Sequence, residues 1–286
     1  MTLDSGIVIE QIGYALGENV IDNGTIVDDK IIAATGFRRH CVVQEGVSLV
    51  DLAFDAAKDL DLSSVKGVVA ATFSGAQRFP ALSIEVAGRL GLDGALPALD
   101  VQMACSAYPY ALYVAHSFAR DLGGKILILN GDVQSPFVDK NDKNTAPLFS
   151  DAATATVMSA KKGASSRFEF FSKYDTALQC PSNGPVKMDG FKVFEFVANE
   201  VSSLLKKFDG ESFDYFVPHQ ANMYMTRQLA RSIGAEEKLL RGNPDFANPG
   251  SCSIALTLAN AKKRGKMLLA GFGAGLSAVA VTVEVR

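Results

Sequence analysis

The chain has no tryptophan and little cysteine or histidine: four and three residues, respectively, among 286. The cysteines, at positions 41, 105, 180 and 252, form no Cys-x-x-Cys pair, so we expect neither a metal site nor a dithiol redox motif. A chain of this length buries enough apolar surface to fold without disulfides, which favours reduced thiols and a cytoplasmic location. One thiol is then available as a nucleophile, and the others act as small hydrophobic residues.

Long apolar runs and a surplus of basic charge are also lacking. No stretch approaches the roughly 18 uninterrupted apolar residues of a membrane span, and the first residues lack the basic region of a signal peptide. The formal net charge is -3. We therefore expect no membrane span and no nucleic-acid partner.

Short runs of apolar and β-branched residues alternate with amphipathic stretches. This alternation predicts an α/β protein with a sheet covered by helices on both faces. The expected strands are 66–72, 125–132, 153–158, 214–219, 267–272 and 278–285, and the expected helices are 49–60, 106–120, 223–233 and 254–261.

The second half of the chain repeats the order of elements in the first half. Corresponding positions lie 141 to 147 residues apart, as in the pairs Gly67 and Asp214, Cys105 and Asn248, and Ile126 and Met267. Similar offsets indicate tandem duplication of one α/β unit. We place the boundary near residue 165, which gives halves 1–165 and 166–286, and expect the halves to pack as one body.

Cys105 stands where an apolar segment gives way to the helix expected over 106–120. A cysteine there faces the positive end of the helix, which favours the thiolate and lowers its pKa from about 8.5. Its backbone N–H can point toward a developing oxyanion. On position alone, a small buried hydrophobic residue is the more frequent case.

His219 ends one expected strand and precedes the helix at 223–233, a place where sites form in α/β folds. A capping histidine is an equally weighted alternative. Asn248 lies in an Asn/Pro/Gly cluster, where turn and capping roles are common. We expect His116 to be structural, because it lies three helical turns past Cys105, and His40, which follows two arginines, to be solvated.

The segment 271–275, Gly-Phe-Gly-Ala-Gly, follows a strand but has no βαβ unit after it. It is therefore not expected to bind a dinucleotide. A turn of this kind does let backbone N–H groups approach a ligand closely.

Together these segments resemble the β-ketoacyl-acyl carrier protein synthase III family, in order and over almost the whole chain. They are Thr35-Gly-Phe-Arg38, Phe79-Pro80, Gln102-Met-Ala-Cys-Ser106, Leu148-Phe-Ser-Asp151, Val217-Pro-His-Gln-Ala-Asn222, Ala247-Asn-Pro-Gly-Ser-Cys-Ser253 and Gly271-Phe-Gly-Ala-Gly275. The resemblance implies a thiolase fold: two βαβαβαββ halves in a five-layer α-β-α-β-α sandwich. It also implies a homodimer, no cofactor, and acyl carrier protein as a partner.

In that family a cysteine takes an acyl group from a thioester, and malonyl on the carrier loses CO2 before its carbanion attacks the acyl-cysteine. The resemblance implies that Cys105 is the nucleophile and that His219 and Asn248 donate hydrogen bonds to the enolate oxygen. It implies a second oxyanion site at the backbone N–H groups of Cys105 and Ala274.

Two phenylalanines also match the family. Phe79 would reach the acyl pocket of the partner subunit, and Phe194 matches a structural phenylalanine near the cysteine. Core packing is the alternative for both, since buried aromatic rings mainly supply apolar area.

Some positions depart from the family. Members that use coenzyme A hold the adenine between a tryptophan and an arginine, and Lys30 and Lys143 stand at those positions. Ala34 replaces another basic residue, and Tyr224 an arginine that helps to seat the carrier. A lysine offers no stacking surface, so we expect a carrier-bound acyl donor, or coenzyme A held differently. A basic carrier dock is expected from Arg227, Arg231, Lys206, Lys207, Lys262, Lys263 and Arg264.

Three alternatives remain open at this point. A relative of the same fold could pass the acyl group to an alcohol or amine. The chain could be a non-catalytic subunit of a heterodimer. A thiol hydrolase could use Cys, His and Asn in this order.

Overall fold

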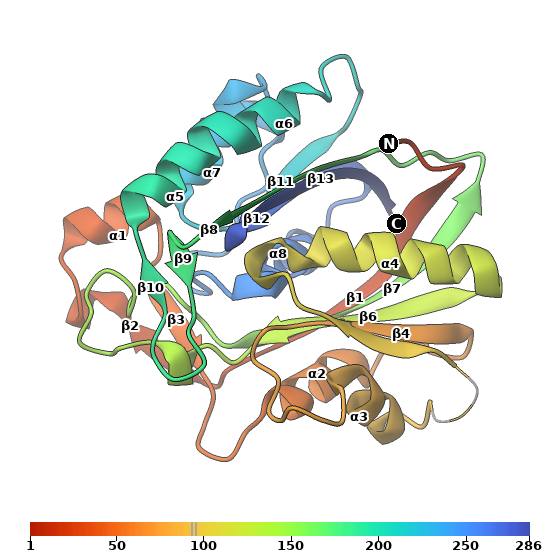
Figure 1. Cartoon of the computed structure of the whole chain (residues 1–286), viewed down its shortest axis with the longest axis horizontal. Coiled ribbons are helices and arrows are strands. Elements are labelled where there is room, and N and C mark those ends of the chain that lie inside the picture. Colours follow the sequence, from red (N-terminus) through yellow and green to blue (C-terminus); the bar gives the residue numbers. More distant parts are fainter. Residues whose placement is uncertain (93, 95) are drawn as a thin grey trace.

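The computed structural model describes residues 1–92, 94 and 96–286. In Figure 1 helices and sheets alternate in five layers, with α4 (Ala107–Leu122) and α8 (Ser253–Ala261) in the middle. Buried residues of these two helices, such as Leu112 and Ile254, share one hydrophobic core with strands of both halves. The predicted five-layer arrangement is confirmed.

The strands of the first half lie in the order β1-β7-β6-β4-β5. β4 runs parallel to β5 and β6, whereas β7 runs antiparallel to both β6 and β1. The outer face is covered by α2 (Leu49–Ala57) and α3 (Leu82–Arg89). The strand bounds are β1 Ser5–Leu16, β4 Val65–Ala71, β5 Ala98–Val101, β6 Lys125–Asp132 and β7 Ala152–Lys162.

The second half repeats this pattern with β11-β12-β13-β8. β11 and β12 are parallel, and β13 is antiparallel to β12 and β8. Leu239 pairs with Phe216 in an isolated parallel bridge at the place that β5 takes in the first half. The elements are β8 Phe168–Asp175, β11 Tyr215–Pro218, β12 Gly265–Gly273 and β13 Gly275–Val285, with α5 Gly190–Phe196, α6 Ser202–Lys206 and α7 Met223–Ser232 outside.

The two halves meet where β1 and β13 pair in parallel through Val8 and Ile9. The boundary near residue 165 falls in the connection between β7 and β8. A division into 1–165 and 166–286 as separate units stays a prediction.

Local sequence explains where the helices begin and end. α2 starts at a capping box, in which the side chains of Ser48 and Asp51 each accept a hydrogen bond from the other's backbone. α4 ends at Gly123, whose φ of 67° lies in the left-handed region that favours glycine. These signals fix where α2 begins and where α4 ends.

Two small ribbons flank the sandwich at one end: β2 (Asn19–Asp22) with β3 (Arg39–Val42), and β9 (Leu178–Gln179) with β10 (Lys187–Met188). The short helix α1 (Asp29–Thr35) connects β2 to β3. The prediction that His40 is solvated is wrong. Arg39 is exposed, whereas the next two residues of β3, His40 and Cys41, are buried, and the His40 ring is bonded to the buried side chain of Asn23.

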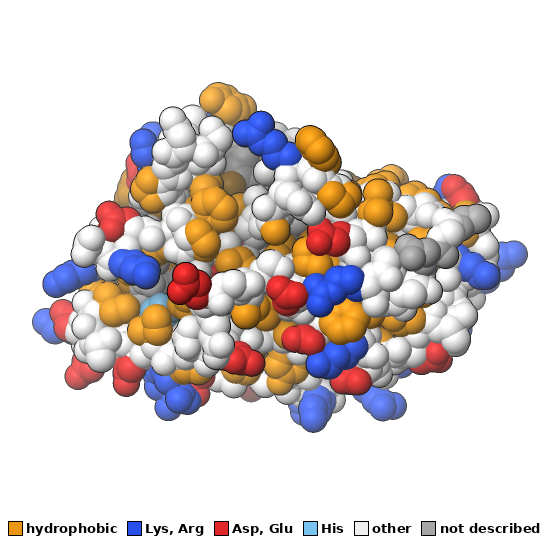
Figure 2. Space-filling model, turned by 90° about the horizontal axis from the view of Figure 1, so that it is seen from below, with side chains coloured by type: hydrophobic (Ala, Val, Ile, Leu, Met, Phe, Trp, Pro, Cys, Tyr) orange, Lys and Arg blue, Asp and Glu red, His pale blue; other side chains and the backbone are white. Residues whose placement is uncertain are grey.

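Within the part of the chain that the structure describes, no helix is long and apolar enough to cross a membrane. Among the same residues, no cluster of His, Cys, Asp and Glu is suited to a metal ion. Figure 2 shows acidic and basic side chains interspersed on the face seen from below. This mixture agrees with the nearly balanced formal charge of the chain.

Candidate active site

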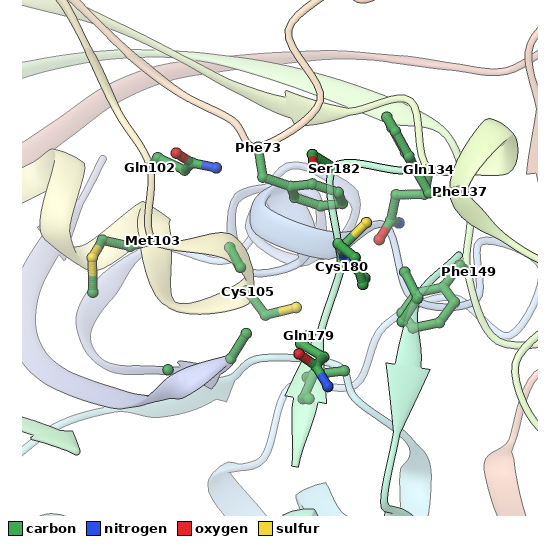
Figure 3. A pocket seen from close by; sticks show the side chains of 16 residues that line it. Phe73, Gln102, Met103, Cys105, Gln134, Phe137, Phe149, Gln179, Cys180 and Ser182 are labelled. Carbon is green, nitrogen blue, oxygen red and sulfur yellow. The ribbon is translucent and has the colours of Figure 1, made fainter. Parts of the chain in front are cut away.

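Cys105 lies in a 3₁₀ turn, Ala104–Ser106, directly before α4. It is 8% exposed and points into a cavity of about 540 Å³ (Figure 3). The end of β12 approaches it closely, since a Cβ added to Gly273 would lie 2.7 Å from the Cβ of Cys105. β12, the sheet neighbour of β11, therefore brings the second half of the chain against Cys105.

The predicted lowering of the cysteine pKa is not what the structure shows. Burial, with a smaller effect of the Asp132 carboxylate, raises the pKa of Cys105 to about 12. Removal from water penalises the thiolate more than the helix start was expected to favour it. The side chain of Cys105 is therefore a protonated thiol at rest.

His219 directly follows β11 and is 2% exposed. Its Nδ1 shares a 2.6 Å hydrogen bond with Oγ of Ser253, which also accepts from the backbone N–H of Gln220. In the tautomer in which the Ser253 hydroxyl donates to Nδ1, the hydrogen of the imidazole is on Nε2. Burial lowers the pKa of His219 to about 3, so the ring is a neutral donor.

Asn248 precedes α8 and is 5% exposed. Its Oδ1 accepts a 3.0 Å hydrogen bond from the N–H of Gly250, so its amide hydrogens face the other way. Among the described residues its side-chain nitrogen donates no hydrogen bond. Asn248 is therefore a second neutral donor that is available to a substrate.

Gln134 and Asp132 connect the Asn248 loop to the cysteine cavity. Gln134 lines that cavity, and its Nε2 donates to the carbonyl oxygens of Ser150 and Asn248 at 2.7 and 3.0 Å. Asp132 is fully buried and accepts hydrogen bonds from Thr72, Phe73 and Ser251. Burial raises the pKa of Asp132 to about 6.

The glycine-rich turn is tied to the cysteine turn by hydroxyl groups. Ser106 and Ser277 share a hydrogen bond of 2.7 Å, and Ser277 donates to the carbonyl oxygen of Ala274 at 2.9 Å. Ala274 and Cys105 line the same cavity. This arrangement brings together the two residues whose backbone N–H groups were expected to form the second oxyanion site.

Other predicted residues lie farther out. Phe79 is 83% exposed, and Phe194 on α5 packs on Tyr224 with the ring centres 5.8 Å apart. Neither phenylalanine is among the residues that line the Cys105 cavity. Arg227 and Arg231 are exposed on α7, which begins shortly after His219. Lys206 and Lys207 lie at the C-terminal end of α6. Lys262, Lys263 and Arg264 follow the C-terminal end of α8, whereas Asn248 precedes the N-terminal end of that helix.

Sequence reasoning missed several residues that shape the site. Ser253 orients His219 and was visible only as part of the Asn-Pro-Gly-Ser-Cys-Ser segment. Gln134 and Asp132 follow or end a strand without a motif of their own. Their positions at the end of β6 were the one available signal, because strand ends in α/β folds carry sites.

Comparison with known proteins adds a family to this geometry. A family model described as 3-oxoacyl-[acyl-carrier-protein (ACP)] synthase III matches residues 99–175, and one described as its C-terminal part matches residues 206–285. A β-ketoacyl-[acyl-carrier-protein] synthase III from Laribacter hongkongensis is 30% identical over 284 residues, covering 87% of this chain and 88% of the relative.

Two further relatives also cover most of the chain. A β-ketoacyl-[acyl-carrier-protein] synthase III 2 from Deinococcus radiodurans is 33% identical, covering 87% of this chain and 84% of the relative. The solved structure of a 3-oxoacyl-(acyl carrier protein) synthase III from Pseudomonas aeruginosa superposes with a TM-score of 0.89 at 28% identity, covering 98% of each chain.

Proposed function

Because this chain belongs to the β-ketoacyl-acyl carrier protein synthase III family, we propose that it joins an acyl thioester to malonyl-acyl carrier protein by decarboxylative condensation. The predicted family is confirmed, and the comparisons favour condensation over transfer to an alcohol or amine. The proposal is supported by the buried thiol of Cys105 in its cavity, by Gln134, which lines that cavity and donates to the Asn248 carbonyl, and by the neutral imidazole of His219, which packs on Phe272 near the end of β12.

In the first step the sulfur of Cys105 attacks the carbonyl carbon of the acyl thioester. The carbonyl oxygen gains charge, and the N–H groups of Cys105 and Ala274 donate to it. The donor thiolate leaves and takes up the proton that Cys105 gives up. Because the pKa of the Cys105 thiol is raised to about 12, this proton transfer accompanies the attack rather than preceding it.

In the second step malonyl-carrier loses CO2, and the electron pair of the broken bond enters an enolate. Nε2 of His219 and Nδ2 of Asn248 donate to the enolate oxygen. Two neutral donors suit an oxygen that gains charge, and each is typically worth roughly 3–4 kcal/mol. The enolate carbon then attacks the acyl carbon on Cys105 and releases the sulfur.

The acyl donor arrives on a carrier protein. Lys30, Ala34 and Lys143, at the places where the adenine-binding residues of coenzyme A-using relatives are expected, are all exposed side chains without a flat surface. Arg227 and Tyr224 are exposed on α7, and they offer a basic and an aromatic contact to an acidic carrier. Two copies of the chain form the working enzyme.

The test is intact-protein mass spectrometry of wild type and variants with acyl-carrier and acyl-coenzyme A donors. We expect an acyl adduct that requires Cys105 and clears when malonyl-carrier is added. His219→Ala and Asn248→Ala should still form the adduct but clear it on the order of 100-fold more slowly. His116→Ala serves as a matched control, because His116 bonds Ser5 away from the site.

Three results would contradict parts of the proposal. An adduct that persists with malonyl-carrier points to a different acceptor. No adduct from any donor favours a non-catalytic subunit. Efficient acylation by acyl-coenzyme A removes the preference for a carrier-bound donor and leaves the condensation itself intact.

A further inference from the structure

A second cavity, of about 1020 Å³, lies behind one wall of the Cys105 cavity. Its lining comes from β2, β3, the segment after β3, and the segment 133–146. Phe149 lines both cavities, and Gln134 and Phe137 face the Cys105 side, as Figure 3 shows for these three side chains. A single stretch of chain and one aromatic ring therefore separate the two spaces.

The second cavity has a polar rim and an apolar wall. Its rim consists of exposed residues, among them Gln44, Glu45, Asp139, Lys140 and Asn141. The wall consists of aliphatic residues that are buried or half-buried: Ile21, Ile26, Val42, Val43, Val47, Val133, Val138 and Ala146. In Figure 2 hydrophobic side chains show between charged ones toward the left, the end of the molecule that carries β2 and β3 in Figure 1.

His40 is the polar feature of this wall. Its Nδ1 lies 2.7 Å from Oδ1 of Asn23, whose Nδ2 donates to the carbonyl oxygens of Phe37 and Pro147 at 3.1 and 2.9 Å. Because both amide hydrogens are used, the Asn23 oxygen is fixed as an acceptor and Nδ1 of His40 carries the hydrogen. Nε2 is then a bare acceptor, and burial lowers the pKa of His40, which keeps the ring neutral.

Nε2 of His40 has no hydrogen-bond partner among the described residues, and it is not sealed from solvent. Ser135, the other polar residue of the wall, donates its hydroxyl to Asp151 at 2.6 Å. The side chain of His40 is about as buried as the core around it, with 5% of the residue exposed. A deeply set acceptor in an apolar cavity selects a ligand that brings one donor.

We propose that the second cavity binds a neutral aliphatic chain that carries a hydroxyl group, with the O–H donating to Nε2 of His40. An anion is disfavoured because the wall presents an acceptor, and a cation because the aliphatic wall cannot replace its water. The aliphatic lining fits an alkyl chain, and cavities of about 300–1,000 Å³ hold ligands of more than ten heavy atoms. This inference is independent of the proposed reaction.

The test is a calorimetric titration of the whole protein with 1-decanol and with 1-methoxynonane, isomers that differ in whether the oxygen carries a hydrogen. We expect one saturable site that prefers the alcohol by about five- to tenfold, the usual effect of one hydrogen bond. His40→Phe should remove the preference between the two ligands. Val138→Phe, which narrows the cavity and leaves His40 with Asn23, should weaken both.

Val20→Phe is the matched control, because Val20 is 53% exposed on β2 and lies outside the lining. Circular dichroism and a thermal melt check that His40→Phe folds, and Val138→Phe keeps the test decisive if it does not. Equal affinity for alcohol and ether in the wild type, or absence of a saturable site, overturns the proposal. Binding that neither variant changes places the alcohol outside the second cavity and overturns the proposal as well.

Discussion

Cys105 and Asn248 each follow an alanine in the left-handed region of backbone space. Ala104 has a φ of 44° and Ala247 a φ of 45°. Cys105 and Asn248 are corresponding positions of the two halves of the chain, so the duplication extends to the backbone conformation of the residue before each of them. Such conformations cost a non-glycine residue on the order of 1–3 kcal/mol and are concentrated at functional sites.

Replacing Ala104 by glycine is expected to stabilise the protein. Glycine adopts a positive φ without the clash of a Cβ, so the free energy of unfolding should rise by up to about 1 kcal/mol. Urea denaturation followed by circular dichroism measures the change. Ala33→Gly, on the exposed side of α1, is the control and should destabilise by about 1 kcal/mol. A loss of stability in Ala104→Gly would show that the strain is absent.

The raised pKa of Cys105 leads to a prediction on reactivity. Because burial holds the thiol protonated, the rate of alkylation of Cys105 by iodoacetamide should rise about tenfold per pH unit throughout the stable pH range. A thiol with its ordinary pKa reaches a plateau above about 8.5. Peptide mass spectrometry separates Cys105 from the exposed Cys180. If the alkylation rate instead reached a plateau near neutral pH, the pKa of Cys105 would be lowered, as its position before a helix predicts.

At the scale of elements, the sequence predicted best where hydrophobic pattern alone decides. The strand expected at 125–132 is β6, Lys125–Asp132, and the helix expected at 223–233 is α7, Met223–Ser232. β6 has a continuous run of buried residues, and α7 has a stripe of them on one face, so the sequence pattern alone indicates both elements. The long strand β1 was not identified, although it pairs with β7 from Ser5 to Leu16 with one irregularity between Ile9 and Gln11.

The predictions that were wrong, on the exposure of His40 and the pKa of Cys105, depend on contacts between distant segments of the chain. His40 is bonded to Asn23, which in turn donates to the carbonyl of Pro147, and neither residue is near His40 in sequence. The pKa of Cys105 is governed by its enclosure and by Asp132 at the end of another strand. The identities of Cys105, His219 and Asn248 were available from motifs, whereas their protonation and hydrogen bonding were not.

Ser277 on β13 links the two elements that carry the expected oxyanion site. Ser277→Ala removes its hydrogen bonds to Ser106 and to the Ala274 carbonyl, so the turn at Ala274 is less well positioned. We expect acylation of Cys105 to slow by about tenfold or more, the usual cost when an oxyanion donor is disturbed. Stopped reactions analysed by mass spectrometry give kcat and KM separately, and the loss should fall on kcat.

Rescue distinguishes this positioning role from a general loss of structure. Ser277→Thr keeps the hydroxyl and should recover most of the rate. Ser117→Ala, which removes a hydroxyl bonded within α4, is the matched control. Equal damage from both alanine variants, or no change in kcat, would argue against a link through Ser277.

At the scale of the whole molecule, Phe79 is a large side chain without a place in the single chain. It is 83% exposed, although a phenylalanine gains roughly 1.5–3 kcal/mol when fully buried. Three other phenylalanines, Phe73, Phe137 and Phe149, line the Cys105 cavity. A second copy that contributes Phe79 would bury this ring and complete the cavity wall.

The proposed homodimer should therefore depend on Phe79. Phe79→Ala is expected to raise the dimer dissociation constant by at least about tenfold, because losing roughly 1.4 kcal/mol or more of buried apolar contact has that effect. Sedimentation equilibrium measures the constant. Phe191→Ala removes the same side chain from a site that is 75% exposed on α5, and it should leave association unchanged. A monomeric wild type, or equal effects of both variants, would mean that Phe79 does not reach a partner.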